Sequence, residues 1–507
     1  MATKNANPGS AGFVEAEDKT YVAITELKPG AVGIAGAVMQ NVTHIAPAIA
    51  AFFFTQTLVG TAGSGAGATA PLAYFIGLLI VIPLGVCLME LARKFPSAGG
   101  YFTYVSRTLG PVMGFLTAWV FVLYSPIASG PSLAVLGQIL QDELTANYGI
   151  TWFHWYYAPI IGIPLAAWAG YTGVSFSMKW IVTVGAAEFL IVLFLALSGL
   201  ANPGPGGFSF GPFIPGFNPG GIATFTGFFL AVVLTVQGLT GWEAAVPLAE
   251  ETSNPRRNVP RSIMASILII GIMLVIAQWG QVIGWGTNDL AKLGPSSEIP
   301  ALVIAHRIWG SLWWLTLLAM ITSVLGVTLA CQNVATRMWY SMGRAGVLPA
   351  SFARIHPTRK TPTTAVLAQA ILSVGVGIVG PYLMGTWAFF IFLVGYTLVL
   401  AVIFVYIAAN IGLVKYFLTE ARWEFNFILH FVFPAGTSLV LLYSIYAAFV
   451  PLPAAPNNYT PLVAALWLVA GIVIVIWMKA QGRSDWLTKA GEVIAEREAT
   501  ASEKPML

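Results

Sequence analysis

The residues with the clearest chemical potential lie in a polar interruption, Gln237–Glu243, within an apolar run from Ile222 to Leu248. Two glycines, a glutamine, a threonine and a glutamate interrupt a segment long enough to cross a bilayer. A glycine costs about 1 kcal/mol in a helix interior and a carboxylate at the bilayer centre about 2.5 kcal/mol or more, so the interruption needs a reason. We expect a broken helix whose free backbone groups bind a ligand. The alternative is a kinked helix whose polar side chains are satisfied by neighbouring helices.

A second polar interruption lies near the start of the chain, where Gln40, Asn41, Thr43 and His44 precede Pro47. Proline has no N–H to donate and its ring clashes with the preceding turn, so the helix should open between Thr43 and Pro47. Broken helices at corresponding places in two halves of a chain indicate an inverted repeat with a site at mid-membrane. His44 is either a hydrogen-bonded histidine of the bundle or a direct ligand contact.

Three carboxylates fall within or at the ends of apolar runs. Glu90 stands beside Arg93 and Lys94, where we expect an ion pair at the membrane interface. Glu188 should lie about 13 Å into the membrane, counted from the preceding lysine at about 1.5 Å per residue. Buried charge is rare in membrane helices and usually functional. Glu188 is therefore a candidate proton carrier, a contact for a cationic ligand, or a structural group, and Glu243 is the third carboxylate.

Other kinds of chemistry find no support in the sequence. The two cysteines, Cys87 and Cys331, lie in separate apolar runs and predict neither a disulfide framework nor a metal site. No phosphate-binding loop, zinc-ligand spacing or nucleophile motif occurs. We therefore expect no enzyme activity, no metal and no cofactor. Any energy for the protein's work would come from an ion gradient or from ligand exchange, because no soluble segment is long enough for an ATPase.

The elements that position these residues must be membrane helices. The chain has 507 residues, of which 57% are hydrophobic and 9% charged, and its mean hydropathy is +0.79. An average soluble domain has about 25% charged residues. We expect an all-α polytopic membrane protein with twelve transmembrane helices, because runs of about 20 apolar residues occur at twelve places. They lie near residues 32–57, 71–92, 112–137, 156–173, 179–200, 222–249, 263–284, 312–336, 363–383, 387–414, 427–449 and 460–478.

The positions of the 24 Lys and Arg residues predict the orientation of these helices. If the N-terminus is cytoplasmic, all of them except Lys292 and Arg307 fall on cytoplasmic loops and termini, as the positive-inside rule requires. Both termini then lie inside, which agrees with an even number of spans. The net charge of +4 reflects this topology and predicts no nucleic-acid partner. We expect a multi-pass protein of the plasma membrane.

Three motifs in the predicted cytoplasmic loops carry a resemblance to a known family. They are Glu90-Leu with Phe95-Pro and Gly99-Gly-Tyr101, then Glu250-Glu251-Thr-Ser-Asn-Pro255 with Pro260-Arg261, and finally Arg337-Met-Trp-Tyr-Ser-Met-Gly-Arg344 with Pro349 and Pro362. In their types, spacing and order these motifs resemble those of the amino acid-polyamine-organocation superfamily.

The resemblance implies the leucine-transporter fold, with two inverted five-helix repeats, broken helices 1 and 6, and two peripheral helices. On this basis we divide the chain into a cytoplasmic N-terminal arm (1–31), a first repeat (32–200), a second repeat (222–416), helices 11 and 12 (427–478) and a cytoplasmic tail (479–507). The tail either forms a short surface helix or is frayed.

The resemblance also implies that backbone groups at the two breaks hold the amine and the carboxylate of a substrate. In helix 1, Gln40–Pro47 replaces the family's Gly-Ser-Gly-Ile-Phe type of segment. The tryptophan that stacks over substrate in the arginine/agmatine exchangers corresponds to Gln237, which cannot stack on a guanidinium as an indole does, so arginine is not favoured. Glu243 matches a gating or pH-responsive glutamate of those exchangers. Glu188 falls near the place where several sodium-independent members carry a lysine.

Taken together, these patterns predict a secondary active transporter with alternating access for an amino acid or a closely related amine, with the proton as the coupling ion in symport. The alternatives are a polyamine or organic-amine exchanger, and a membrane sensor or channel that binds such ligands without carrier turnover. Sodium coupling stays open. The expected partners are this small molecule and the lipid bilayer. Predicted substrate-site residues are Gln40, Asn41, Thr43, His44, Tyr124, Gln237, Gly238, Thr240, Gly241 and Asn333, with Ser125 and Tyr396 as further candidates and with Glu188 and Glu243 in proton coupling or gating.

Overall fold

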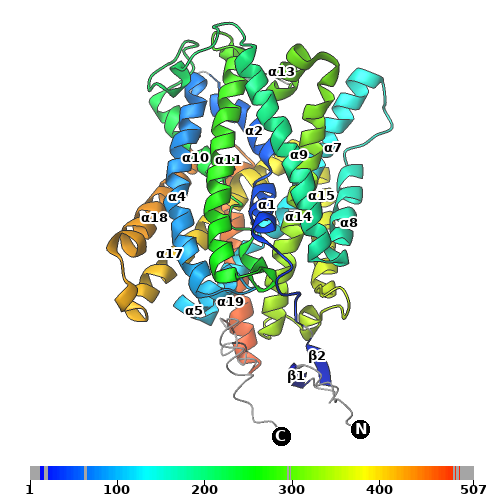
Figure 1. Ribbon diagram of the computed structural model, residues 1–507, viewed down its shortest axis with the longest axis vertical. Helices are drawn as coiled ribbons and strands as arrows, with labels where there is room; N and C mark the ends of the chain where they lie inside the picture. Colours follow the sequence, from blue (N-terminus) through cyan, green and yellow to red (C-terminus); the bar gives the residue numbers. More distant parts are fainter. Residues whose placement is uncertain are drawn as a thin grey trace, which may run out of the picture.

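The protein is a bundle of long helices that run side by side along its long axis (Figure 1). The computed structural model describes residues 12–15, 21–24, 26–61, 65–293, 296, 298–482, 486 and 490. Within these residues, nine helices are long and apolar enough to cross a membrane, and one bent pair makes a tenth candidate span. The predicted helical, polytopic membrane fold is therefore confirmed.

The spans follow the predicted apolar runs closely. The long ones are α4 (Ala70–Lys94), α6 (Pro111–Phe121) with α7 (Ser125–Tyr148), α9 (Val174–Ala201), α11 (Pro255–Trp285), α14 (Trp314–Arg344), α15 (Thr363–Met384), α16 (Thr386–Phe390) with the π-helix η6 (Ile391–Thr397) and α17 (Leu398–Thr419), the π-helix η8 (Ile428–Val432) with α18 (Phe433–Phe449), and α19 (Thr460–Ala480). The bent pair is α1 (Ile34–Ile45) with α2 (Pro47–Phe52) and α3 (Phe54–Val59). The fourth and sixth runs form the shorter helices α8 (Tyr157–Thr172) and α10 (Phe225–Gly238), so the count of twelve spans stays a prediction.

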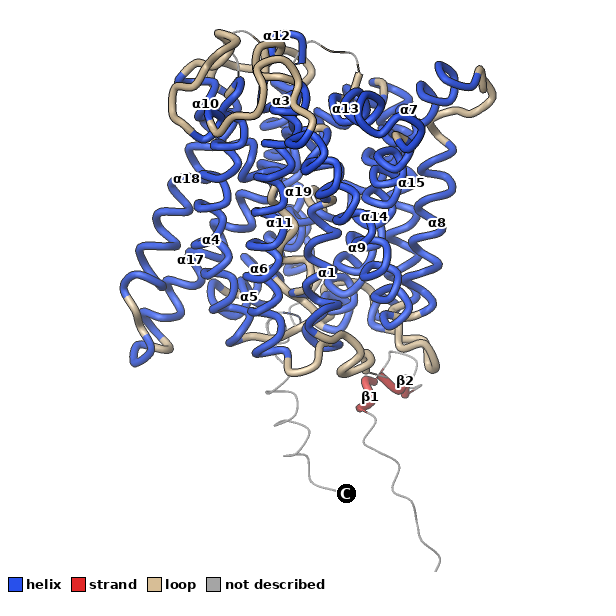
Figure 2. Tube along the Cα trace, turned by 45° about the horizontal axis from the view of Figure 1, so that its top comes forward, coloured by secondary structure: helices blue, strands red, loops and turns tan. Residues whose placement is uncertain are grey.

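Short elements mark the two ends of the bundle. At one end, here called the hairpin end, an antiparallel pair of strands, β1 (Gly12–Glu15) and β2 (Tyr21–Ile24), lies beyond the ends of the helices, and α5 (Tyr101–Leu109) lies at the same end of the bundle (Figure 1). This hairpin departs from the all-α expectation but stands outside the bundle. At the opposite, loop end lie α12 (Leu290–Leu293), α13 (Pro300–Trp309) and long loops (Figure 2). The predicted tail helix falls largely outside the described residues, and the proposed domain boundaries stay predictions.

The outer surface of the bundle matches a lipid environment. On α15, Leu367, Ile371 and Leu383 are 63%, 65% and 73% exposed. Apolar side chains exposed to this extent along a long helix are matched by lipid tails rather than by water. Inside the bundle, small residues bring helices close together, as is usual in membranes. A Cβ added at Gly130 of α7 would lie 2.4 Å from the carbonyl oxygen of Ser373 on α15.

The predicted break in helix 1 is confirmed and lies at Ala46. Helix α1 ends at Ile45, α2 begins at Pro47, and the two parts are bent by 40°. Ala46 adopts a left-handed conformation with φ 58° and ψ 73°, which is uncommon for a residue with a Cβ. Pro47 supplies the fixed φ of a first helical residue and has no N–H that would be left unpaired there. The proline identified in the sequence therefore starts a new helix.

The predicted break in helix 6 is also confirmed and is longer. Helix α10 ends at Gly238, turns follow, and the 3-10 helix η3 (Val246–Glu251) precedes α11. Gly241 has a φ of +117°, a conformation that side chains rarely adopt. A Cβ on Gly241 would lie 2.7 Å from Nδ1 of His44 and 2.9 Å from the backbone nitrogen of Ile45. The two breaks thus touch each other, and glycine is required at the point of contact.

The last span is fixed to the third by a pair of tryptophans. The rings of Trp119 on α6 and Trp467 on α19 stack with centroids 4.4 Å apart. Each indole N–H donates to the other residue's backbone carbonyl, over 2.7 Å from Trp119 and 2.8 Å from Trp467. A helix that the sequence predicts to be peripheral therefore has a specific, reciprocal contact with the first half of the chain.

Candidate functional site

A cavity lies where the two broken helices meet. The empty space inside it, which includes open solvent at its mouth, is about 690 Å³. The lining comes from both breaks, from α7, from α14 and from the span that contains η6. It consists of His44, Ile45, Ala46, Ile49, Ala50, Phe54, Tyr124, Ser125, Ala128, Ser132, Gln237, Gly238, Thr240, Val327, Cys331, Phe390, Val394 and Leu398.

His44, at the end of α1, connects the first break to two neighbouring helices. Its Nε2 lies 2.9 Å from the hydroxyl of Ser125 at the start of α7 and 3.5 Å from the Cys331 thiol on α14. Its Nδ1 has no hydrogen-bond partner within the described residues and faces Gly241 of the second break. His44 thus has both features considered from the sequence, because it is hydrogen-bonded inside the bundle and also lines the cavity.

Gln237 connects the second break to the π-helix η6. Its side-chain N–H donates to the carbonyl oxygens of Val394 and Gly395, over 3.2 Å in each case. The hydroxyl of Thr240 donates to the backbone oxygen of Gln237 over 2.8 Å. A π-helix is frequent at functional sites because its wider turn leaves carbonyls available to other donors. Gln237 uses two of them to hold the tenth helical segment against the cavity.

Gln40 and Asn41 are completely buried and form contacts within the protein. The Asn41 side chain donates to the hydroxyl of Ser266 on α11 over 3.2 Å and accepts the N–H of Ala245 over 2.6 Å. The Gln40 side chain donates to the Ala330 carbonyl of α14 over 3.1 Å. Both amides therefore tie the first break to the second break and to the surrounding helices.

The two buried carboxylates near the breaks are held differently. On α9, Oε1 of Glu188 accepts the backbone N–H of Ala48, at the start of α2, over 2.8 Å, and the carboxylate has Ser323 of α14 as a further polar neighbour. Glu188 is fully buried. It therefore bridges α9 to the half-helix that begins at Pro47, behind the cavity wall rather than in it.

Glu243 lies in a cage of hydroxyl groups directly behind the cavity. It accepts hydrogen bonds from the phenols of Tyr124 and Tyr406, over 2.6 and 2.9 Å, and from the N–H of Gly241 over 3.1 Å. Tyr124 is at the same time part of the cavity lining. A change at Glu243 can thus affect the cavity lining through the phenol of Tyr124.

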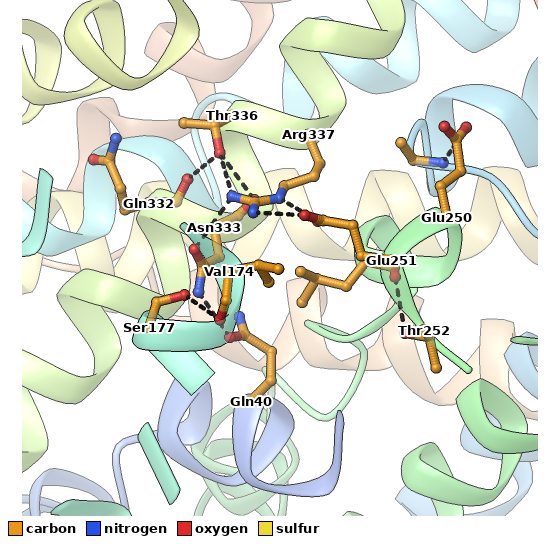
Figure 3. A network of polar contacts seen from close by, with 12 residues as sticks. Gln40, Val174, Ser177, Glu250, Glu251, Thr252, Gln332, Asn333, Thr336 and Arg337 are labelled. Atoms are coloured by element: carbon orange, nitrogen blue, oxygen red, sulfur yellow. Dashed lines mark hydrogen bonds and ion pairs between the residues drawn. The ribbon is translucent and has the colours of Figure 1, made fainter. Parts of the chain in front are cut away.

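A buried polar network lies on the hairpin-end side of the breaks, and Figure 3 shows its members. Arg337 of α14 donates to both carboxylate oxygens of Glu251, over 2.8 and 3.2 Å, and both side chains are fully buried. Arg337 also donates to the Asn333 side chain over 3.2 Å, and Asn333 donates to Gln40 over 3.2 Å. The distribution of Lys and Arg in the sequence placed Arg337 in a cytoplasmic loop. This assignment was wrong, because Arg337 lies within α14 and Glu251 compensates its charge inside the bundle.

The same network joins the start of the first span to the end of the broken sixth segment. The N–H of Val32 donates to the Glu251 carbonyl and the N–H of Ser253 donates to the Val32 carbonyl, over 2.9 Å each. Nearby, Arg344 donates to both carboxylate oxygens of Glu250 over 2.7 and 2.9 Å. The hairpin-end side of the site is therefore closed by ion pairs and by backbone pairing.

The predicted site residues divide into two groups. His44, Tyr124, Gln237, Gly238 and Thr240 line the cavity, as does Ser125. Not among the lining residues are Gln40, Asn41, Thr43, Gly241, Asn333, Tyr396, Glu188 and Glu243. Whether any of these residues contacts a substrate stays a prediction. Sequence reasoning missed Phe54, Val327 and Phe390, because no polar type or break distinguishes them from other residues of the apolar runs. It also missed Ser132, which is polar but lies far along the chain from both breaks.

The comparison with protein families decides what kind of protein carries this site. The family described as Amino acid permease, part of the superfamily whose motifs the loops resemble, matches residues 36–485. The chain belongs to this family. The permease is accordingly a membrane transporter for amino acids or amines.

Individual relatives of the permease handle different substrates. A branched-chain amino acid permease of Bacillus subtilis is 27% identical over 343 residues, which cover 64% of this chain and 70% of that relative. A low-affinity putrescine importer of Escherichia coli is 24% identical over 343 residues, covering 65% and 73%. An L-methionine/branched-chain amino acid exporter of Escherichia coli is 24% identical over 274 residues, covering 53% and 60%. These similarities leave the substrate and the direction of transport open.

Proposed function

We propose that the permease is a secondary active carrier that imports an amino acid or a close amine relative across the plasma membrane by alternating access. The observation that carries this proposal is the cavity between the two helix breaks, with a closed polar network on its hairpin-end side. A carrier needs a central site that is closed on one side at a time, and broken helices supply hinges for that change.

The orientation follows from the distribution of charge. Arg354, Arg359 and Lys360 lie between α14 and α15, and Arg256 and Arg257 lie at the start of α11. With these residues in the cytoplasm, the hairpin end faces inward and both termini are cytoplasmic. The closed side of the site is then the cytoplasmic one, so release into the cell requires the Arg337–Glu251 contact to open.

The proton is the proposed coupling ion, and Glu188 is its proposed carrier. Glu188 is buried, and its bond to the N–H of Ala48 connects its protonation state to the half-helix that must move. Buried carboxyl groups in membrane helices commonly form proton relays. Glu243, fixed by two phenols and a backbone N–H, suits gating better, since it touches the cavity lining through Tyr124.

The rival readings are an exchanger for amines and a sensor or channel that binds ligand without carrier turnover. Counterflow in proteoliposomes separates a carrier or exchanger from a channel or sensor, and the compound used shows whether amino acids or amines are accepted. Vesicles loaded with unlabelled leucine, or with putrescine in a second set, receive labelled compound outside. A carrier or exchanger accumulates label transiently above equilibrium, whereas a channel only equilibrates and a sensor takes up nothing. Absence of counterflow with every amino acid and amine tested would overturn the proposal.

A further inference from the structure

The charges of the cavity lining bear on which ligands it can accept. Among its lining residues, all within the described part of the chain, none is Asp, Glu, Lys or Arg. Its polar side chains are an imidazole, hydroxyls, a thiol and an amide. A ligand that brings a net charge into this cavity would lose its hydration without gaining a countercharge.

The nearest carboxylates do not supply the missing countercharge, because both lie behind the wall of the cavity. Glu243 receives three donors, from Tyr124, Tyr406 and Gly241. Glu188 receives the N–H of Ala48 and is fully buried. Neither carboxylate is among the residues that line the cavity, so neither offers its charge directly to an ammonium group bound there.

The polar and apolar groups of the lining are segregated. His44, Ser125, Thr240 and Cys331 gather where the two breaks meet. This polar edge suits a group that carries a positive and a negative charge side by side and has no net charge.

Most of the rest of the lining is apolar and comes from several helices. Ile49 and Phe54 come from the second part of the first span, Val327 from α14, and Phe390, Val394 and Leu398 from the span that contains η6. Few hydroxyl donors of the lining are free to bond a sugar-like ligand, because Thr240 and Ser132 already donate to backbone carbonyls of their own segments. The wall is therefore suited to an uncharged, apolar side chain.

We propose that the substrate is a zwitterionic amino acid with an apolar side chain and that the permease discriminates against diamines and cationic amino acids. The inference rests on the proposed carrier function. Selectivity arises from the neutral lining, which solvates neither an extra ammonium group nor an unpaired one.

Isosteric ligands test this without any mutation. Norleucine and lysine share a four-carbon side chain and differ in the terminal ammonium group, and pentylamine and 1,5-diaminopentane extend the comparison to ligands that lack a carboxylate. Each is used as a competitor of labelled leucine and of labelled lysine in counterflow with wild-type protein. Norleucine should compete at least ten-fold better than lysine and than either amine.

Equal or better competition by lysine or the diamine would overturn the inference while leaving the carrier function intact. Loss of counterflow with every compound would instead remove the carrier function and this inference with it.

A matched pair of variants then tests whether lining charge is the cause. Ser132 lines the cavity, is partly buried, and its hydroxyl donates within its own helix to the Ala128 carbonyl over 2.8 Å. Ser132→Asp adds a negative charge, and Ser132→Asn adds the same shape without the charge. The norleucine-to-lysine preference should be several-fold lower in Ser132→Asp than in Ser132→Asn. An equal change in both variants would contradict charge as the basis of selectivity.

Discussion

At the scale of single residues, the hydrogen bonds that each polar side chain already makes within the protein determine which side chains are available to a ligand. Asn41 and Gln40 have the residue types of ligand contacts, yet their amides bond the protein's own backbone and side chains. Thr240 and His44, by contrast, present surface to the cavity. Substitutions at these two kinds of position should therefore have different consequences, one in stability and the other in binding.

Glu188→Gln should separate exchange from concentrative uptake. The amide oxygen can still accept the Ala48 N–H, so the local geometry survives, but the side chain can no longer carry a proton. Leucine counterflow should persist and uptake driven by an inward proton gradient should disappear. Glu243→Gln is the control, expected to shift the pH profile and keep some concentration. If Glu188→Gln still concentrates substrate, coupling lies elsewhere, with His44 or a sodium ion as the next candidates.

Thr240→Leu should abolish ligand binding, because the longer side chain extends into a cavity that Thr240 lines. Thr240→Val is the matched control, since it keeps the shape and removes only the hydroxyl donated to Gln237. The measurement is the ligand-dependent rise in melting temperature of purified protein, which follows binding by mass action. Equal ligand-induced rises in Thr240→Leu and the wild type would place the site elsewhere.

At the scale of elements, the structure joins two breaks that lie far apart in the chain. Gly241 is the contact point, since its backbone conformation and the nearby His44 ring both exclude a side chain. The Arg337–Glu251 pair is the second joint, between α14 and the end of η3. Both joints are predicted to be sensitive, for different physical reasons.

Gly241→Ala should destabilise the fold by about 1–3 kcal/mol from backbone strain alone, with displacement of His44 in addition. Gly375→Ala, on an open face of α15, is the control and should stabilise by up to about 1 kcal/mol because alanine is the better helix former. Melting temperatures of the two variants in the same detergent check this. A lower melting temperature for both would mean that the assay reports glycine loss in general.

Removing one member of the buried ion pair should be costly. Arg337→Met leaves Glu251 as an uncompensated buried charge, for which a loss of about 3–5 kcal/mol is typical. The double variant Arg337→Met with Glu251→Leu should regain much of that loss, because no unpaired charge remains. Thermal unfolding of the single and double variants decides the matter, and a double variant no more stable than Arg337→Met would contradict it.

At the scale of the whole molecule, the proposed topology places the two ends of the bundle on opposite sides of the membrane. Ala350, between α14 and α15, and Pro215, in the loop before α10, are both exposed. With the native cysteines buried, single variants Ala350→Cys and Pro215→Cys provide matched reporters. A membrane-impermeant maleimide should label Pro215→Cys in intact cells and Ala350→Cys only after lysis. The reverse pattern would invert the topology.

The sequence predicted the class of fold, the helix positions and both breaks, because apolar run length, Pro47 and the glycines around Thr240 act locally. It did not predict which polar residues face the cavity. Asn41 and Thr240 are both polar residues next to a predicted break, so the sequence does not distinguish them. In the structure α11 and the second break pack against Asn41, which therefore does not line the cavity. The buried position of Arg337 likewise depends on Glu251, a partner that the sequence placed in a different loop.

The reciprocal tryptophan contact has a consequence for how the chain is made. Trp119 and Trp467 are 348 positions apart. At about 5–20 residues per second, the ribosome needs roughly 20–70 s after Trp119 to produce its partner. During that interval the third span lacks the final helix, with which its indole N–H and backbone carbonyl form hydrogen bonds in the finished fold. Chains that end before residue 467 would lack the carbonyl to which the Trp119 indole N–H donates, so only the complete chain satisfies this donor of the third span.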